Sequence, residues 1–274
     1  MTSSLDAALS GMLTHERGLD LIANNLANVS TTGYKRAVIH FQDILDSAQV
    51  LAVLNGEVPA GGAAVTSAGV GVTNVVRDFA SGPIQPTGRA LDLAIAGDGF
   101  FRVRQDDGSV AYTRAGNLSL DADRRLVTAD GDVIDPDMVV PADSHDVVIG
   151  RDGSVSAVRL YTAAELAALP PDAPTGGVLE QIGQITLSRF ATPTGLDAIG
   201  RNLYVETERS QAPIDGAPGA DGMGEVHSGF LEAANVDLAT EMTMMVLTSR
   251  AYSLNLNAYR TIEQMLSSAN QLAS

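Results

Sequence analysis

The sequence contains no cysteine among its 274 residues, and this absence removes several kinds of chemistry. Disulfides, thiolate metal sites and cysteine nucleophiles all require the missing side chain. Tryptophan is also absent and aromatic residues make up 4% of the chain, so we do not expect a stacking platform for sugars or single-stranded nucleic acid. Because 45% of the residues are apolar, the chain can build a core and be stabilised by packing alone.

Basic residues are scarce, with 17 lysines and arginines against 33 acidic residues and a formal net charge of −16. This balance argues against nucleic acid or an anionic membrane surface as a partner. No run approaches the roughly 18 apolar residues of a membrane-spanning helix, and the first residues lack the pattern of a cleaved secretory signal. We therefore expect no membrane insertion, and either a cytoplasmic protein or one that is exported without such a signal.

Candidate catalytic groups form no recognisable pattern. No two histidines are four residues apart and none lies in an HExxH motif, so the sequence predicts no metal, no cofactor and no catalytic residue. Carboxylates such as Asp92 and Asp98 could perform general acid–base catalysis, but their spacing does not place them in one cleft. We expect no enzyme, and keep a soluble β-domain hydrolase as an alternative.

Proline is missing from both ends of the chain, since all eleven prolines lie between residues 59 and 218. Both ends can therefore be helical. Apolar residues recur there at a spacing of seven: Leu5, Met12 and Leu19 at the N-terminus, and Leu238, Met245, Tyr252, Tyr259 and Leu266 at the C-terminus. This heptad stripe is typical of helices that pack on other helices, so the two seams are expected to pair with each other or with neighbouring copies. The alternative is that each helix packs on a globular core.

The middle of the chain alternates short apolar runs with Asp-Gly turns, a pattern typical of β-hairpins. Two hairpins are predicted, one joining 101–104 to 110–113 and one joining 147–149 to 155–158. The predicted fold class is therefore α+β. Terminal helices (1–36 with 231–274) form a coiled-coil-like pair, an extended region (37–90 with 206–230) connects them, and a mainly antiparallel β domain spans 91–205.

Residues 46–68 carry few charges and no clear periodicity. Asp46 and Glu57 are their only charged residues. This composition suits an extended arm that lies along a neighbouring copy and stiffens an assembly, with a surface loop as the alternative.

An asparagine-rich segment follows the first heptad stripe. Asparagine is a poor helix former whose amide prefers to bond backbone groups or a partner chain. A frayed helix end that stops at Gly33 would explain Asn28, but Asn24 and Asn25 lie one turn further inside the helix. Amides at those positions are better explained as contacts that fix the register of a helical assembly. The predicted assembly motif consists of Asn24, Asn25, Leu26, Ala27, Asn28, Thr31, Gly33 and Tyr34.

This segment, NNLANVSTTGYKR at 24–36, closely resembles the signature of flagellar basal-body rod and hook proteins. Residues 91–101 (LDLAIAGDGFF) with 112–116 (YTRAG) resemble the entry to that family's β domain. Residues 229–237 (GFLEAANVD) resemble the lead into its terminal helix. Three separated motifs in the expected order make the resemblance specific, and it covers essentially the whole chain.

Within this family, residues 194–204 (TGLDAIGRNLY) and the overall length are most similar to the distal rod members. Proximal rod or hook-type axial proteins are the alternative. The resemblance implies a structural subunit of a hollow helical drive shaft, a homo-polymer that spans the periplasm and transmits torque from motor to hook. It also implies contacts with other rod and hook proteins, with the surrounding rings and with the flagellar export apparatus.

Overall fold

The computed structural model describes residues 2–45, 67–159 and 178–273, which form two compact units. The first unit is drawn from residues 1–28, 36–78 and 236–274, and the second from residues 29–35 and 79–235. Residues 37–78 of the predicted connecting region thus belong to the first unit, whereas residues 79–90 and 206–230 belong to the second. Most of the predicted arm, residues 46–66, lies outside the described residues.

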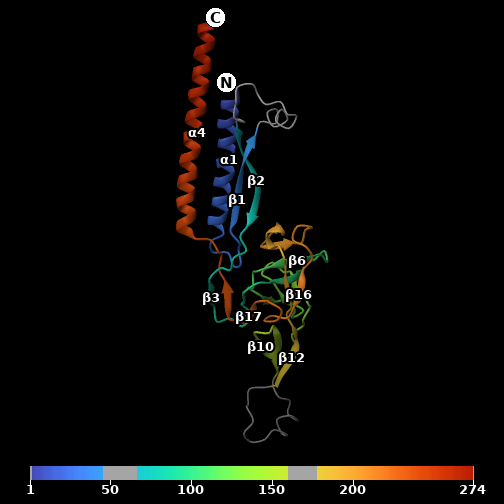
Figure 1. Ribbon diagram of the computed structural model, residues 1–274. Helices are drawn as coiled ribbons and strands as arrows, with labels where there is room; N and C mark the ends of the chain where they lie inside the picture. The colour runs from blue at the N-terminus through green and yellow to red at the C-terminus, as the bar shows by residue number, and fades with distance from the viewer. Residues whose placement is uncertain (1, 46–66, 160–177, 274) are drawn as a thin grey trace, which may run out of the picture. The chain divides into compact units, whose positions relative to one another are not determined.

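Two helices and one hairpin build the first unit (Figure 1). Helix α1 spans Thr2–Ala27 and helix α4 spans Leu238–Ala273, and the two helices lie in contact. Strands β1 (Ala37–Leu45) and β2 (Ser67–Arg77) pair antiparallel and also contact α1. The prediction of a helix at each end is confirmed.

Small residues let α1 approach its neighbours closely. A Cβ placed on Gly11 would lie 2.7 Å from the Asn255 side-chain nitrogen of α4, so no larger side chain fits there without a shift. On an adjacent face of α1, the Thr14 hydroxyl donates a hydrogen bond to the Val70 carbonyl oxygen of β2 at 3.1 Å. Helix α1 therefore packs on α4 with one face and on the hairpin with the next.

The second unit is almost entirely antiparallel β-structure. Its largest sheet has the strand order β14-β15-β6-β5-β9-β8-β7, and β13 bridges β5 to β16 at its side. These strands are β5 (Phe100–Arg104), β6 (Val110–Thr113), β7 (Ser119–Leu120), β8 (Leu126–Val127), β9 (Val133–Ile134), β13 (Leu187–Arg189), β14 (Asp197–Gly200), β15 (Leu203–Val205) and β16 (Ile214–Gly216). A single-turn helix, η1 (Pro193–Gly195), precedes β14.

Three smaller sheets complete this unit. Strands β10, β11 and β12 form one, β4 pairs with β17, and β3 pairs with β18. Their bounds are β3 (Ile84–Pro86), β4 (Leu93–Ala96), β10 (Ser144–Ile149), β11 (Ser154–Arg159), β12 (Val178–Gln184), β17 (Glu225–Ser228) and β18 (Phe230–Glu232). The last two pairings bring residues 84–96 beside residues 225–232, which are far away in the sequence.

The predicted α+β class and the mainly antiparallel middle are confirmed. Strands β5 and β6 pair as the first predicted hairpin, and β10 and β11 as the second. The main core of the second unit is mostly aliphatic, and a separate, mainly aromatic cluster consists of Phe100, Tyr112, Phe190, Leu196 and Tyr204. In the part of the chain that the structure describes, no helix has the length and hydropathy needed to cross a bilayer.

Candidate assembly site

The Asn25 side chain links the end of α1 to the start of β1. It is 1% exposed, its Nδ2 donates to the Ala37 carbonyl oxygen at 2.9 Å, and its Oδ1 accepts from the Ala37 amide at the same distance. Nδ2 also lies 3.5 Å from Oε2 of Glu241 in α4. The buried Asn25 side-chain amide thus forms hydrogen bonds with both backbone groups of Ala37 and also contacts the Glu241 carboxylate of α4. This arrangement explains an asparagine inside a helix, where its propensity is poor.

The neighbouring asparagines behave differently from Asn25. Asn24 is exposed, and its carbonyl oxygen accepts hydrogen bonds from the backbone amide and the side-chain Nδ2 of Asn28, at 3.2 and 2.8 Å. These bonds close the last turn of α1. Leu26 is half-buried and Ala27 is exposed.

The rest of the motif crosses into the second unit. Gly33 has φ of 67°, and a Cβ there would lie 2.6 Å from the backbone of Ala115 and of Arg114. Its amide donates to the Glu232 carbonyl oxygen at 2.8 Å. Because both the conformation and the space exclude a side chain, glycine is required at this position. Thr31 is half-buried and accepts from the amide of Tyr34, whose ring is 4% exposed.

A buried ion pair follows directly after this turn. Lys35, the only lysine in the chain, is fully buried, and its Nζ lies 2.6 Å from Oε1 of Glu232, which is 1% exposed. The ammonium also donates to the Ala80 carbonyl oxygen at 2.8 Å, and Glu232 Oε1 accepts from the Gly82 amide at 2.8 Å. These extra hydrogen bonds offset the cost of removing both charges from water.

Arg114 approaches the same carboxylate from the sheet. Its Nη1 lies 3.6 Å from Oε2 of Glu232 and donates to the Gly97 carbonyl oxygen at 2.9 Å. Burial lowers the pKa of the Arg114 guanidinium, against the opposing effect of the Glu232 and Asp98 carboxylates. The three family-like motifs supply Lys35, Arg114 and Glu232, so they meet at one carboxylate.

The next residue makes an equivalent contact within the first unit. Arg36 Nε forms a short ion pair with Oε1 of Glu241, which is 0% exposed. Adjacent residues of one motif thus pair with carboxylates of different units. Sequence reasoning did not select Lys35, Arg36, Arg114, Glu232 or Glu241 as site residues. Each of the three family-like motifs contains a charged residue, which could have drawn attention to it. The spacing of these residues in the sequence does not identify which of them form ion pairs.

The predicted seam residues lie mostly on covered faces of the helices. Leu5, Met12 and Leu19 of α1 are half-buried, as are four of the five selected residues of α4: Met245, Tyr252, Tyr259 and Leu266. Leu238, at the start of α4, is 47% exposed.

Helix α4 carries a second apolar face that its own unit leaves exposed. Leu247, Leu254 and Met265 are 54, 69 and 57% exposed. Their spacings of seven and eleven residues place them on one side of the helix, opposite the half-buried stripe. A helix with apolar residues on both sides is typical of one that is covered on both sides.

Comparison with known proteins identifies the family. Residues 5–35 match the model described as flagella basal body rod protein, and residues 227–272 match the C-terminal model of the flagellar basal body rod FlgEFG proteins. Residues 94–157 match the flagellar hook protein FlgE/F/G D1 domain. The flagellar basal-body rod protein FlgG of Borreliella burgdorferi is 37% identical over 99% of both chains. FlgG of Bacillus subtilis is 38% identical over 97% of both chains.

The chain belongs to the flagellar basal-body rod protein family. A FlgF protein, from Caulobacter vibrioides, is also similar, at 32% identity over 92% of this chain, below the identity and coverage of the two FlgG relatives above. The resemblance to rod proteins, and to FlgG-type members in particular, is confirmed. The family is structural, so the hydrolase alternative is not favoured. Among the described residues, no group of three or more potential ligands could hold a metal ion.

Proposed function

We propose that this rod protein is the subunit of the distal rod, and that it polymerises into a hollow helical tube which transmits torque from the flagellar motor to the hook. The observation that supports this most directly is the exposed face of α4 formed by Leu247, Leu254 and Met265. At roughly 25 cal/mol per Å² of apolar area removed from water, covering these side chains would stabilise an assembly by several kcal/mol.

The exposed face of α4 has counterparts elsewhere on the first unit. Leu9 and Leu13 of α1 are 45 and 52% exposed, and Met242 and Val246 of α4 are 54 and 51% exposed. Large apolar side chains that are exposed in groups on a protein surface mark an interaction site. In this proposal the helices form the inner wall of the tube, where each pair is covered by the pairs of other copies.

The motif residues would act indirectly in this proposal. Asn25 and Glu241 hold α1 and α4 to one backbone hairpin, so that each copy presents the same surface to the next. The predicted seam, Leu5, Met12, Leu19, Met245, Tyr252, Tyr259 and Leu266, would hold the two helices together, and Leu238 would face another copy.

The place of the protein in the cell is part of the same proposal. The relatives are named as proteins of the flagellar basal body, and we infer the same location for this chain, in the rod that spans the periplasm. The other rod and hook proteins, the surrounding rings and the flagellar export apparatus would be its partners, with export that needs no cleaved signal.

A pair of variants that add the same charge tests the polymer. Leu254→Asp places a negative charge on the exposed apolar face of α4, whereas Gln85→Glu adds a negative charge at an exposed polar position of β3. We expect Leu254→Asp to keep the melting temperature of the parent and lose tube formation in electron micrographs, while Gln85→Glu still forms tubes. Equal tube formation by both variants would contradict the proposed interface.

A further inference from the structure

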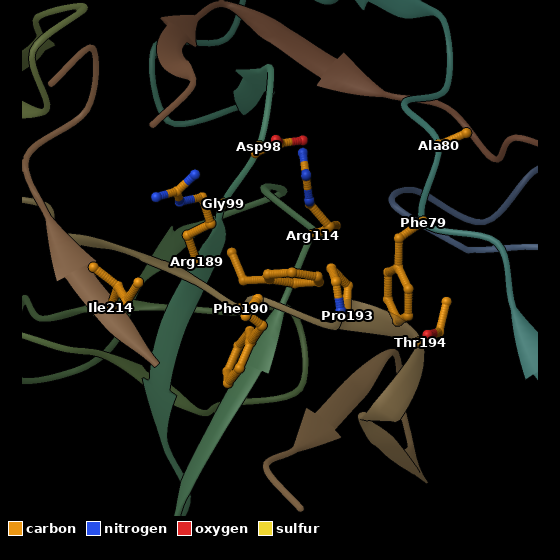
Figure 2. Close-up of a pocket in the computed structure, with 12 residues that line it drawn as sticks. Phe79, Ala80, Asp98, Gly99, Arg114, Arg189, Phe190, Pro193, Thr194 and Ile214 are labelled. Carbon is orange, nitrogen blue, oxygen red and sulfur yellow. The ribbon is translucent and has the colours of Figure 1, made fainter. Parts of the chain in front are cut away.

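The second unit contains a surface pocket in which aromatic rings and two arginines meet (Figure 2). Its volume is about 580 Å³, which is enough for two or three side chains of a peptide. Its apolar wall consists of Phe79, Phe100, Phe190, Pro193 and Ile214.

Arg189, at the end of β13, is the unusual member of this pocket. Its Nε is buried without a hydrogen-bond partner, and within the described parts of the chain no carboxylate forms an ion pair with its guanidinium. A buried donor that gives up water without gaining an acceptor destabilises the isolated protein. We therefore expect Nε of Arg189 to donate a hydrogen bond to an acceptor on a bound ligand.

Arg114 supplies a second guanidinium to the same pocket. Its side chain is 3% exposed and stacks over the Phe100 ring at 5.1 Å, and its Nε also lacks a hydrogen-bond partner. Figure 2 shows Arg114 and Asp98 extending toward one another. Glu232 and Asp98 offset the charge of Arg114, so Arg189 is the cation that is left to pair with an incoming group.

The chemistry of the walls defines the ligand. Guanidinium groups bind carboxylates through two parallel hydrogen bonds, and this geometry favours a planar anion. Ile214 is 50% exposed beside the aromatic rings, which leaves an apolar surface next to the arginines. The pocket therefore suits an acidic residue followed closely by an aliphatic one.

We propose that this pocket binds a carboxylate-bearing segment of a second copy of this chain, with Arg189 as the residue that pairs with the carboxylate. The inference rests on the proposed polymer. The chain has 33 acidic and 17 basic residues, so copies of it repel one another. An ion pair between Arg189 of one copy and a carboxylate of the next would oppose that repulsion. The chain offers such a segment on its edge strand β14, where Asp197 and Ile199 are both exposed and two residues apart.

Charge reversal at matched positions in the full-length chain tests this inference. Arg189→Glu and Arg151→Glu change the net charge equally, and Arg151 is exposed outside the pocket. We expect Arg189→Glu to raise the concentration needed for assembly by about tenfold, measured by light scattering, since it replaces a charge-assisted pair with a repulsive one. Arg151→Glu should leave that concentration within about twofold of the parent value.

A crosslinking measurement covers the case in which Arg189→Glu fails to fold. Ile214 is replaced by the photoreactive residue p-benzoylphenylalanine, and assembled protein is irradiated and digested. We expect crosslinks to an acidic segment of another copy. Crosslinks confined to one chain, or equal assembly of the two charge-reversed variants, would overturn the pocket inference while the polymer proposal stands. A parent chain that never assembles would overturn both.

Discussion

The ammonium nitrogen of Lys35 lies 2.6 Å from Oε1 of Glu232, and both side chains are fully removed from water. The two residues are 197 positions apart in the chain. Their contact joins the turn after α1 to the strand that leads toward α4. Lysine and glutamate are almost never fully buried unless they are paired, so each side chain depends on the other.

Removal of one partner should be more damaging than removal of both. Lys35→Met leaves the Glu232 carboxylate buried without its main partner, and we expect it to lower the free energy of unfolding of the second unit by about 3–5 kcal/mol. The double variant Lys35→Met with Glu232→Gln should recover part of that loss, because the glutamine side-chain oxygen carries no charge and can still accept from the Gly82 amide beside Arg114. Urea denaturation followed by circular dichroism measures both.

The exposed pair of Arg209 with Asp197 provides the control for this experiment. These side chains are 68 and 63% exposed, and their charges lie 3.9 Å apart. Arg209→Met should change the free energy of unfolding by no more than about 1 kcal/mol. If Lys35→Met were equally mild, the buried pair would not be a structural determinant of this unit.

The two adjacent asparagines of the motif should respond differently to truncation. Asn25→Ala leaves the amide and carbonyl of Ala37 buried without their partner, and we expect a loss of about 3 kcal/mol. Asn24 is exposed, so Asn24→Ala should cost about 0.5 kcal/mol or less. Hydrogen exchange of residues 37–45 measures the difference, and similar exchange rates in the two variants would show that the Asn25 amide does not hold β1.

The start of α4 should be sensitive to acid. The Asp237 carboxylate accepts a hydrogen bond from the Thr240 amide at 2.7 Å, and bonds from Thr240 hold the pKa of Asp237 below its ordinary value of 3.8. Because the pKa is lowered on folding, this cap stabilises α4 at pH values above 3.8, and the stabilisation is lost as the pH falls through the lowered value.

Asp237→Asn isolates this titration, since asparagine caps helices as well as aspartate does but carries no charge. We expect the protection factors of the first amides of α4, which are exchange rates corrected for the intrinsic effect of pH, to fall below pH 4 in the parent and to change much less in Asp237→Asn. The same fall in protection in both proteins would assign the effect to another group.

The sequence-based prediction of an arm at residues 46–68 can be tested with a defined deletion. Leu45 pairs with Ser67 in the β1–β2 ladder, so replacement of 46–66 by Asn-Gly would close the two strands with a two-residue turn. We expect the shortened chain to assemble into curved or compliant tubes. Tubes as straight as those of the parent in electron micrographs would mean that the segment does not determine stiffness.

Local patterns predicted the elements of this fold well. The heptad spacing and the absence of proline identified both helices, and Asp107-Gly108 and Asp152-Gly153 identified two hairpins because the turn chemistry is local. The pairing of β3 with β18 and of β4 with β17 could not be predicted, since residues in those pairs are more than 120 positions apart. The sequence pattern of one strand does not identify a partner strand that lies so far away in the chain.

The site was predicted only in part, for the same reason. Asn25 and Gly33 were selected from features of the local sequence. Asn25 is an asparagine inside a predicted helix, and Gly33 is a glycine that follows the helix. Their partners, Glu241 and Glu232, required the folded chain. The exposed face of α4 was also missed, because the heptad analysis followed the stripe through Met245 and Tyr252 and ignored the apolar residues between its members.

The central claim is that the face of α4 around Leu254 becomes covered when the rod protein polymerises. Because the chain has no cysteine, Leu254→Cys provides a single thiol for reaction with a maleimide, and Asp106→Cys, in the exposed turn between β5 and β6, provides the control. We expect the thiol at position 254 to react at least about tenfold more slowly in assembled tubes than in monomers, while position 106 changes far less. Equal reaction rates at position 254 in monomers and tubes would contradict the account.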